Sequence, residues 1–197
     1  MQIVTRELRH MERAKVAAHL RRLDAEDRRL RFGLAVADAA IDDYVARIDF
    51  DRDAVFGVFD DALDLAGAAH LARGDDQAEL GVSVLPACRG RGVGAALLAR
   101  AHLHARNWGI GALFMHCLAE NAAMVHLARK QGMRIVSESG EADAHLALPP
   151  ADAASFAQAV LDERVGLFDY ALKSQFDAVR RLMLAGAGAV APSGHRP

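Results

Sequence analysis

A glycine-rich stretch in the middle of the chain carries residue types suited to binding phosphate. Residues 86–101 read PACRGRGVGAALLARA, with two arginines among three glycines and a helical pattern after them. Glycines let backbone N–H groups approach a pyrophosphate closely, because no Cβ stands in the way. The helix expected to begin at Val93 adds the positive end of its dipole, and the arginines add charge.

Three phosphate-binding motifs compete for this loop. A P-loop needs a Gly-Lys pair, which the chain lacks. The dinucleotide fingerprint is formally matched by Gly90, Gly92 and Ala95, but residues 85–89 separate the preceding strand from the first glycine. The next strand also ends in FMHC, without the acidic residue that the fingerprint requires. The pattern R-x-x-G-x-G, filled by Arg89, Gly92 and Gly94, fits the loop best.

The elements around the loop predict a mixed α/β sheet rather than a long βαβ series. Residues 78–85, AELGVSVL, alternate between an apolar face and a face bearing Glu79, Gly81 and Ser83. Strands are expected near residues 1–8, 54–60, 62–72, 78–85, 110–117, 133–139 and 143–149. Helices are expected near 11–23, 36–48, 93–108 and 120–132, with residues 24–33 as a charged connection.

The core domain is expected to span residues 1–149, because Pro149 and Pro150 end the last strand. Residues 150–185 form a C-terminal helical extension whose apolar stripe must be buried, either on the core or in a homodimer contact. Residues 186–197 are rich in small side chains and are expected to be disordered. The stripe comprises Phe156, Val160, Phe168, Leu172, Phe176, Val179 and Met183.

Composition excludes several classes of protein. The 197 residues are 52% apolar and 25% charged, with a net charge of −2, which gives no global electrostatic case for nucleic acid. No apolar run approaches the roughly 20 residues of a membrane span. Two cysteines and a charged N-terminal stretch without a signal peptide predict reduced thiols and a cytoplasmic protein.

The loop and a second motif resemble the GNAT superfamily of N-acetyltransferases. AELGVSVLPACRGRGVGAALLARA resembles the family's acetyl-CoA-binding segment, and NAAMVHLARKQGM resembles its later motif, with Asn121, Met124, Leu127 and Gly132 in register. The resemblance covers residues 54–148. Within the family, the sequence pattern is similar to the acetyltransferase domains of bacterial protein-lysine acetyltransferases. It implies a mostly antiparallel central sheet flanked by helices, acetyl-CoA as co-substrate, and direct attack by an amine in a ternary complex.

The same resemblance assigns the acetyl-CoA site. Pantetheine is expected along residues 82–84, with a backbone N–H at or next to Val84 polarising the carbonyl. Asn121 is expected to hydrogen-bond the co-substrate or to order the end of its strand. The expected binding residues are Val82, Ser83, Val84, Arg89, Gly90, Arg91, Gly92, Val93, Gly94 and Asn121.

An alkyl amine with a pKa near ~10.4 must lose a proton before it attacks, so a base is needed. Glu79, on the strand that leads to the loop, is the candidate, since the family often carries a glutamate there. If residues 73–76 form a four-residue hairpin loop, His70 lies opposite Glu79 with Cβ atoms about 5 Å apart. His70 would then set the protonation of Glu79 or relay its proton.

The chain departs from the family where many members have a tyrosine that protonates the leaving sulfur. That position is Ala128, and the two tyrosines, Tyr44 and Tyr170, lie outside the motif. A thiol of pKa ~8.5 leaves near pH 7 at a cost of only about 2 kcal/mol, so the loss need not abolish activity. Weak substitutes are Ser83, His116 and His126.

Two functions therefore remain open. The chain is either an acetyltransferase for a small amine or a protein lysine, or a non-catalytic module that only binds acetyl-CoA. Acidic residues on the first helices could attract a cationic amine or merely form a solvated face; they are Asp38, Asp42, Asp43, Asp49, Asp51 and Asp53. No metal site is expected, because His102 and His104 point to different faces of their helix.

Overall fold

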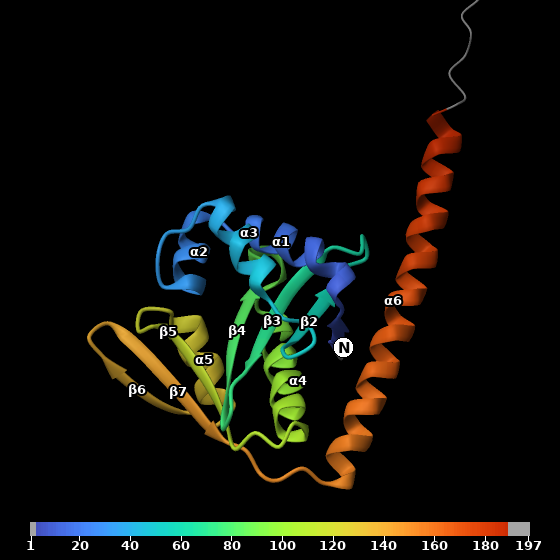
Figure 1. Ribbon diagram of the computed structural model, residues 1–197. Helices are drawn as coiled ribbons and strands as arrows, with labels where there is room; N and C mark the ends of the chain where they lie inside the picture. Colours follow the sequence, from blue (N-terminus) through green and yellow to red (C-terminus); the bar gives the residue numbers. More distant parts are fainter. Residues whose placement is uncertain (1–2, 189–197) are drawn as a thin grey trace, which may run out of the picture.

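Seven strands form one sheet through the molecule (Figure 1). They are β1 (Arg6–Leu8), β2 (Ala54–Phe59), β3 (Leu65–Arg73), β4 (Gln77–Val84), β5 (Ala112–Leu118), β6 (Arg134–Glu138) and β7 (Glu141–Ala147). The computed structural model describes residues 3–188. The strand order is β1-β2-β3-β4-β5-β7-β6, and every neighbouring pair is antiparallel except the parallel pair β4 and β5. The predicted mixed, mostly antiparallel sheet is confirmed.

Helices cover both faces of this sheet. They are α1 (Arg13–Arg21), α2 (Ala25–Phe32), α3 (Asp38–Arg47), α4 (Val93–Asn107), α5 (Ala122–Lys130) and α6 (Ala153–Gly188). One apolar core lies between the sheet and α4, and includes the fully buried Phe56, Leu97 and Leu113. A second core lies beneath α1 and α3 and includes Ile41 and Val55. None of the helices in the described part of the chain is long and apolar enough to cross a membrane.

Strand β4 divides its side chains between the two faces as its alternation predicts. Ala78, Leu80 and Val82 are buried in the core beneath α4. Glu79, Gly81 and Ser83 therefore face the side that α1, α2 and α3 cover. This second set lies where an acceptor could approach the sheet.

The register of the β3–β4 hairpin differs from the prediction. Arg73 pairs with Ala78, and the N–H of Gly74 donates to the carbonyl of Gln77 at 3.0 Å, so the turn is two residues shorter than expected. His70 consequently lies opposite Gly81, not opposite Glu79. Glu79 and His70 are diagonal neighbours on one face, and the predicted direct pairing is wrong.

Residues 24–33 form a helix where a charged connection was expected. The side chain of Asp24 accepts a hydrogen bond from the N–H of Asp27 at 2.8 Å and caps the start of α2. Gly33, with φ of +78°, ends it in the left-handed conformation that terminates many helices. Acidic residues in the first turn and basic residues in the last complement the helix dipole, which stabilises a helix with few apolar residues.

The C-terminal extension is one long helix, α6, that crosses the molecule beside β1 and α4 (Figure 1). Its polar and small side chains face the core: Arg100 of α4 bonds Glu163 at 2.9 Å, and a Cβ on Gly166 would lie 2.5 Å from the carbonyl oxygen of Thr5. The predicted apolar stripe, from Phe156 to Met183, is exposed and does not pack on the core of its own chain, so the homodimer contact stays a prediction. Of the predicted disordered tail, residues 186–188 belong to α6, and residues 189–197 lie outside the described residues.

Candidate active site

Strands β4 and β5 separate near the middle of the sheet. They pair only where Gln77–Glu79 meets Ala112–Phe114; beyond that point β4 continues beside β3 and β5 beside β7. A cavity of about 410 Å³ opens in the gap, and we call it the β4–β5 cleft. Its lining comes from four segments of the chain. The lining residues are Leu23, Asp27, Leu30, Arg31, Val82, Ser83, Val84, Cys88, Arg89, Gly90, Gly92, Val93, Gly94, Ala95, Asn121, Ala123, Met124, His126, Leu127 and Lys130. Helix α2 contacts both β4 and β5 beside this gap.

The glycine loop presents unbonded backbone N–H groups to the β4–β5 cleft. Gly90 and Gly92 adopt φ of +71° and +88°, a conformation that other residues enter only with strain. Within residues 3–188, no acceptor is found for the N–H groups of Val93, Gly94 and Ala95. These groups lie at the N-terminus of α4 and are free to donate hydrogen bonds to an anion such as a pyrophosphate.

Almost all of the predicted binding residues line this cleft. Those that do are Val82, Ser83, Val84, Arg89, Gly90, Gly92, Val93, Gly94 and Asn121. Arg91 is exposed and does not line it. Arg91 is therefore outside the cavity wall, and its expected contact with a phosphate stays a prediction.

The guanidinium of Arg89 points back to the end of β4. Its Nε donates to the carbonyl of Val84 at 3.0 Å, and Nη2 pairs with the Asp27 carboxylate at 2.7 Å. Asp27 lies on α2, and its second carboxylate oxygen is buried without a hydrogen-bond partner in the described chain. Such an orphaned acceptor in a cavity wall favours a ligand that donates a hydrogen bond there.

The side chain of Asn121 makes hydrogen bonds to two helices that line the cleft. Its side-chain oxygen accepts the N–H of Met124 at 3.1 Å and caps α5, and its amide donates to the carbonyl of Leu30 at 3.3 Å. Asn121 therefore ties the start of α5 to α2. The two roles expected for it, a hydrogen bond to the co-substrate or ordering of the end of its strand, both stay predictions.

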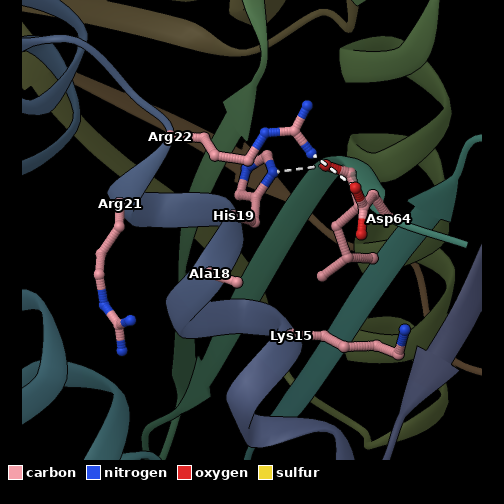
Figure 2. A pocket seen from close by; sticks show the side chains of 7 residues that line it. Lys15, Ala18, His19, Arg21, Arg22 and Asp64 are labelled. Carbon is pink, nitrogen blue, oxygen red and sulfur yellow. Dashed lines mark hydrogen bonds and ion pairs between the residues drawn. The ribbon is translucent and has the colours of Figure 1, made fainter. Parts of the chain in front are cut away.

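Ser83 is held by a buried histidine. The Ser83 hydroxyl lies 2.9 Å from Nε2 of His19. The other ring nitrogen of His19 (labelled in Figure 2), Nδ1, lies 2.8 Å from the carbonyl oxygen of Leu65. Since a carbonyl only accepts, Nδ1 carries the proton, and Nε2 accepts the Ser83 O–H. Burial lowers the pKa of His19 to about 4, so this imidazole is neutral at pH 7.

A chain of polar side chains runs from α3 and β3 to Gly81. Asp53 lies 3.0 Å from Nε2 of His70, whose Nδ1 lies 2.7 Å from the Tyr44 hydroxyl. Nη2 of Arg31 donates to the same hydroxyl at 2.9 Å. Burial is the main cause that lowers the pKa of His70, so it is neutral at pH 7, with Nε2–H toward Asp53 and Nδ1 accepting from Tyr44. His70 thus contacts Tyr44 and Asp53 and does not hydrogen-bond Glu79.

Glu79 stands at the point where the strands separate. It is the last residue of β4 that pairs with β5, opposite Phe114. Its side chain is exposed, and it takes part in no ion pair or hydrogen bond of its side chain within residues 3–188. It is therefore accessible to an amine and to water, as a general base must be.

The position of the missing tyrosine is closed to the cleft. Ala128 is buried in the core beneath α4 and α5 and does not line the cavity. Of the proposed substitutes, Ser83 and His126 line the cleft, whereas His116 pairs with Asp143 at 2.7 Å on another part of the sheet.

Sequence reasoning missed the contribution of α2. Asp27, Leu30 and Arg31 line the cleft, yet residues 24–33 were expected to be a connection. The cap residues Asp24 and Gly33 would have revealed the helix. Nothing in the sequence pattern would have revealed that Tyr44, His70 and Arg31 meet, because they come from three separate elements.

The geometry agrees with comparison to known proteins. A model of the "Acetyltransferase (GNAT) family" matches residues 19–133, more than half of the chain. The chain belongs to the GNAT acetyltransferase family. Its members are N-acetyltransferases that use acetyl-CoA, so this GNAT protein is an acyltransferase. A search of curated protein sequences finds no significant match.

Solved structures show the same fold. The GNAT domain of S. lividans PAT superposes with a TM-score of 0.63 at 19% identity, over 73% of this chain and 89% of that one. The yncA protein of Salmonella typhimurium, solved with its cofactor acetyl-CoA, gives 0.58 at 19%, over 78% and 98%. Ribosomal-protein-alanine N-acetyltransferase from Brucella melitensis gives 0.57 at 19%, over 74% and 100%. In a GNAT protein, the free N–H groups at α4 are the expected place for the pyrophosphate of acetyl-CoA.

Proposed function

We propose that this GNAT protein acetylates a primary amine by direct attack on acetyl-CoA, with both substrates bound together. The observation that carries the proposal is the gap between β4 and β5, because its two sides offer different chemical groups. One side of the gap holds the free N–H groups of α4. The other side holds Glu79 and the Asp53–His70–Tyr44–Arg31 chain, which a module that only binds acetyl-CoA would not need.

Two candidate nucleophiles, Cys117 and Ser83, are poorly suited to form an acetylated enzyme. Burial, with a smaller contribution from Asp143, raises the pKa of the Cys117 thiol, which keeps it protonated and a poor nucleophile. Ser83 has a histidine partner, but His19 has a pKa of about 4 and is a weak base at pH 7. Neither residue is well suited to carry the acetyl group.

Glu79 is proposed to take the proton of the acceptor amine, directly or through water. The backbone N–H at or next to Val84 is proposed to stabilise charge on the thioester oxygen, because an N–H aimed at developing charge is an effective catalyst. The thiolate of CoA is a moderate leaving group near pH 7 and can depart without a tyrosine.

The test combines two kinetic measurements. Initial rates at varied acetyl-CoA and amine should give intersecting double-reciprocal lines, whereas parallel lines would show an acetyl-enzyme and contradict the proposal. Glu79→Gln should lower kcat by about 100-fold or more, with acetyl-CoA affinity unchanged. The matched control is Glu138→Gln, an exposed strand glutamate outside the cleft, which should keep the wild-type kcat.

We also propose that two copies pair through the exposed apolar stripe of α6. Leu161, Val165, Phe168 and Leu172 recur eleven residues later as Leu172, Phe176, Val179 and Met183, which keeps the stripe on one side of the helix. These side chains are between 40% and 72% exposed. A second copy would cover these side chains in an interface of about the standard size, ~800 Å² per partner.

A further inference from the structure

Arg31 is a charged side chain in the β4–β5 cleft that lacks an acidic partner. It is half-buried, donates to the Tyr44 hydroxyl at 2.9 Å, and lies 5.1 Å from the ring centroid of Phe32. No carboxylate in residues 3–188 forms an ion pair with it. The other arginines of α2 are both paired, Arg28 with Asp38 at 2.8 Å and Arg29 with Glu26 at 2.7 Å.

Gly81 makes room for this guanidinium. A Cβ on Gly81 would lie 2.1 Å from Nη2 and 2.4 Å from Cζ of Arg31, so the guanidinium rests directly against the strand backbone. Gly81 lies between Glu79 and Ser83 on the same face of β4. With a rise of roughly 3.3 Å per residue, Arg31 is about 7 Å along the strand from each of them.

Tyr44 fixes the orientation of Arg31. The Tyr44 hydroxyl donates to neutral His70, whose other nitrogen is held by Asp53, so its oxygen is left to accept from Arg31. His70, Tyr44 and Asp53 are thus positioning residues. A guanidinium has five N–H donors, and Tyr44 occupies one of them, so the others are available to a ligand.

A half-buried guanidinium without a counter-ion selects a planar anion, and a carboxylate matches its fork with two parallel hydrogen bonds. The acceptor amine must reach this same stretch of β4. We propose that the acceptor is a small amine that also carries a carboxylate, as an amino acid does, and that Arg31 binds this carboxylate. The inference rests on the proposed amine acetylation. A lysine inside a protein chain has no such carboxylate nearby, so the inference favours a small-molecule acceptor.

The test uses pairs of acceptors that differ only in a carboxylate. Suitable pairs are phenylalanine and phenethylamine, tyrosine and tyramine, histidine and histamine, and lysine and cadaverine, with a lysine peptide blocked at both ends as a further acceptor. Release of the CoA thiol is followed at saturating acetyl-CoA. In at least one pair, the carboxylate-bearing member should have a kcat/KM at least 10-fold above that of its partner.

Variants of Arg31 then assign the preference to this side chain. Arg31→Gln should raise KM for the carboxylate-bearing acceptor by about 10-fold to 100-fold and should raise KM for the plain amine by a much smaller factor. Arg31→Lys should recover part of the loss, because it restores the charge without the fork. Arg22→Gln removes an exposed arginine that pairs with Asp64 outside the cleft, and it should change neither KM.

The outcomes separate the inference from the proposed function. Equal rates for both members of every pair, a preference for the plain amines or the blocked peptide, or an equal loss for both members in Arg31→Gln would overturn the inference alone. If no amine in the panel is acetylated while acetyl-CoA still binds, the proposed function fails, and the inference fails with it.

Discussion

At the scale of single residues, the buried imidazole of His19 contributes to the stability of the fold and also holds Ser83, a residue of the cleft lining. It is fully buried, it holds the Ser83 hydroxyl, and its contacts leave no acceptor for a second proton. A charged His19 would have to donate from both nitrogens, which would break the bond that Ser83 now donates. Protonation therefore opposes the native state.

The pKa of His19 predicts how stability depends on pH. The native pKa is about 4, against an ordinary value of 6.5, so the unfolded chain binds this proton more readily. Stability contributed by neutral His19 is present above pH 6.5 and is lost as pH falls toward 4. Between pH 7.5 and pH 5 the loss should be about 2 kcal/mol, measured by urea unfolding at each pH.

His19→Gln should remove this share of the pH dependence, and His116→Gln should keep it, because His116 is exposed on another part of the sheet. His104, whose pKa burial also lowers to about 4, supplies a second share that both variants retain. If the free energy of unfolding of His19→Gln depended on pH as steeply as that of wild type, the role given to the buried His19–Ser83 pair would be wrong.

At the scale of elements, α2 is the helix on which the cleft depends. It supplies Asp27 and Arg31 to the lining, and it is held by Asn121 from the start of α5 and by Arg89 from the glycine loop. Its few apolar side chains give it little packing energy of its own, so its caps matter more than usual.

Removing the N-cap of α2 should therefore weaken the site more than the fold. Asp24→Ala is expected to cost about 1 kcal/mol and to raise KM for the acceptor, because α2 positions Arg31. Unfolding by urea and acceptor kinetics measure the two effects. Asp61→Ala, in an exposed turn away from the cleft, is the control that should change neither. Unchanged acceptor kinetics in a destabilised Asp24→Ala would show that α2 does not position the site.

The elements that could be predicted from the sequence are those with a strong pattern within one segment of the chain. The alternation of β4 and the glycines before α4 predicted the strand, the loop and the part of the cleft lining that these two segments supply. The register of His70 depended on the turn after Arg73, where a shift of two residues keeps the face but changes the partner. The meeting of Arg31, Tyr44 and His70 depends on tertiary packing, which no local pattern encodes.

At the scale of the whole molecule, α6 turns its polar face to its own core and its apolar face outward. The centroid of the Tyr170 ring lies 4.2 Å from Cζ of Arg6 and 4.7 Å from the centroid of Phe59, which it meets edge-on. Asp177 is buried, whereas Phe176 is 72% exposed. Exposed apolar surface of this extent marks an interaction site in a soluble protein. The proposed second copy would cover it.

The proposed pairing predicts a dimer that one charge can break. Light scattering during gel filtration should give twice the chain mass of 21.2 kDa for wild type and the monomer mass for Phe176→Glu. Ser174→Glu adds a charge at an exposed position on another face of α6 and should remain dimeric. A monomeric wild type, or a dimeric Phe176→Glu, would contradict the pairing.

We propose that the β4–β5 cleft binds acetyl-CoA through the free N–H groups after Gly92. The most direct measurement is a calorimetric titration of the chain with acetyl-CoA, with NAD as the control ligand. Gly92→Val should abolish binding, because a β-branched residue opposes the φ of +88° there. Gly132→Val places the same strain at a φ of +77° outside the cleft lining and should bind normally. Binding of acetyl-CoA but not NAD, lost only in Gly92→Val, is the predicted result. A folded wild type that does not bind acetyl-CoA would contradict the account.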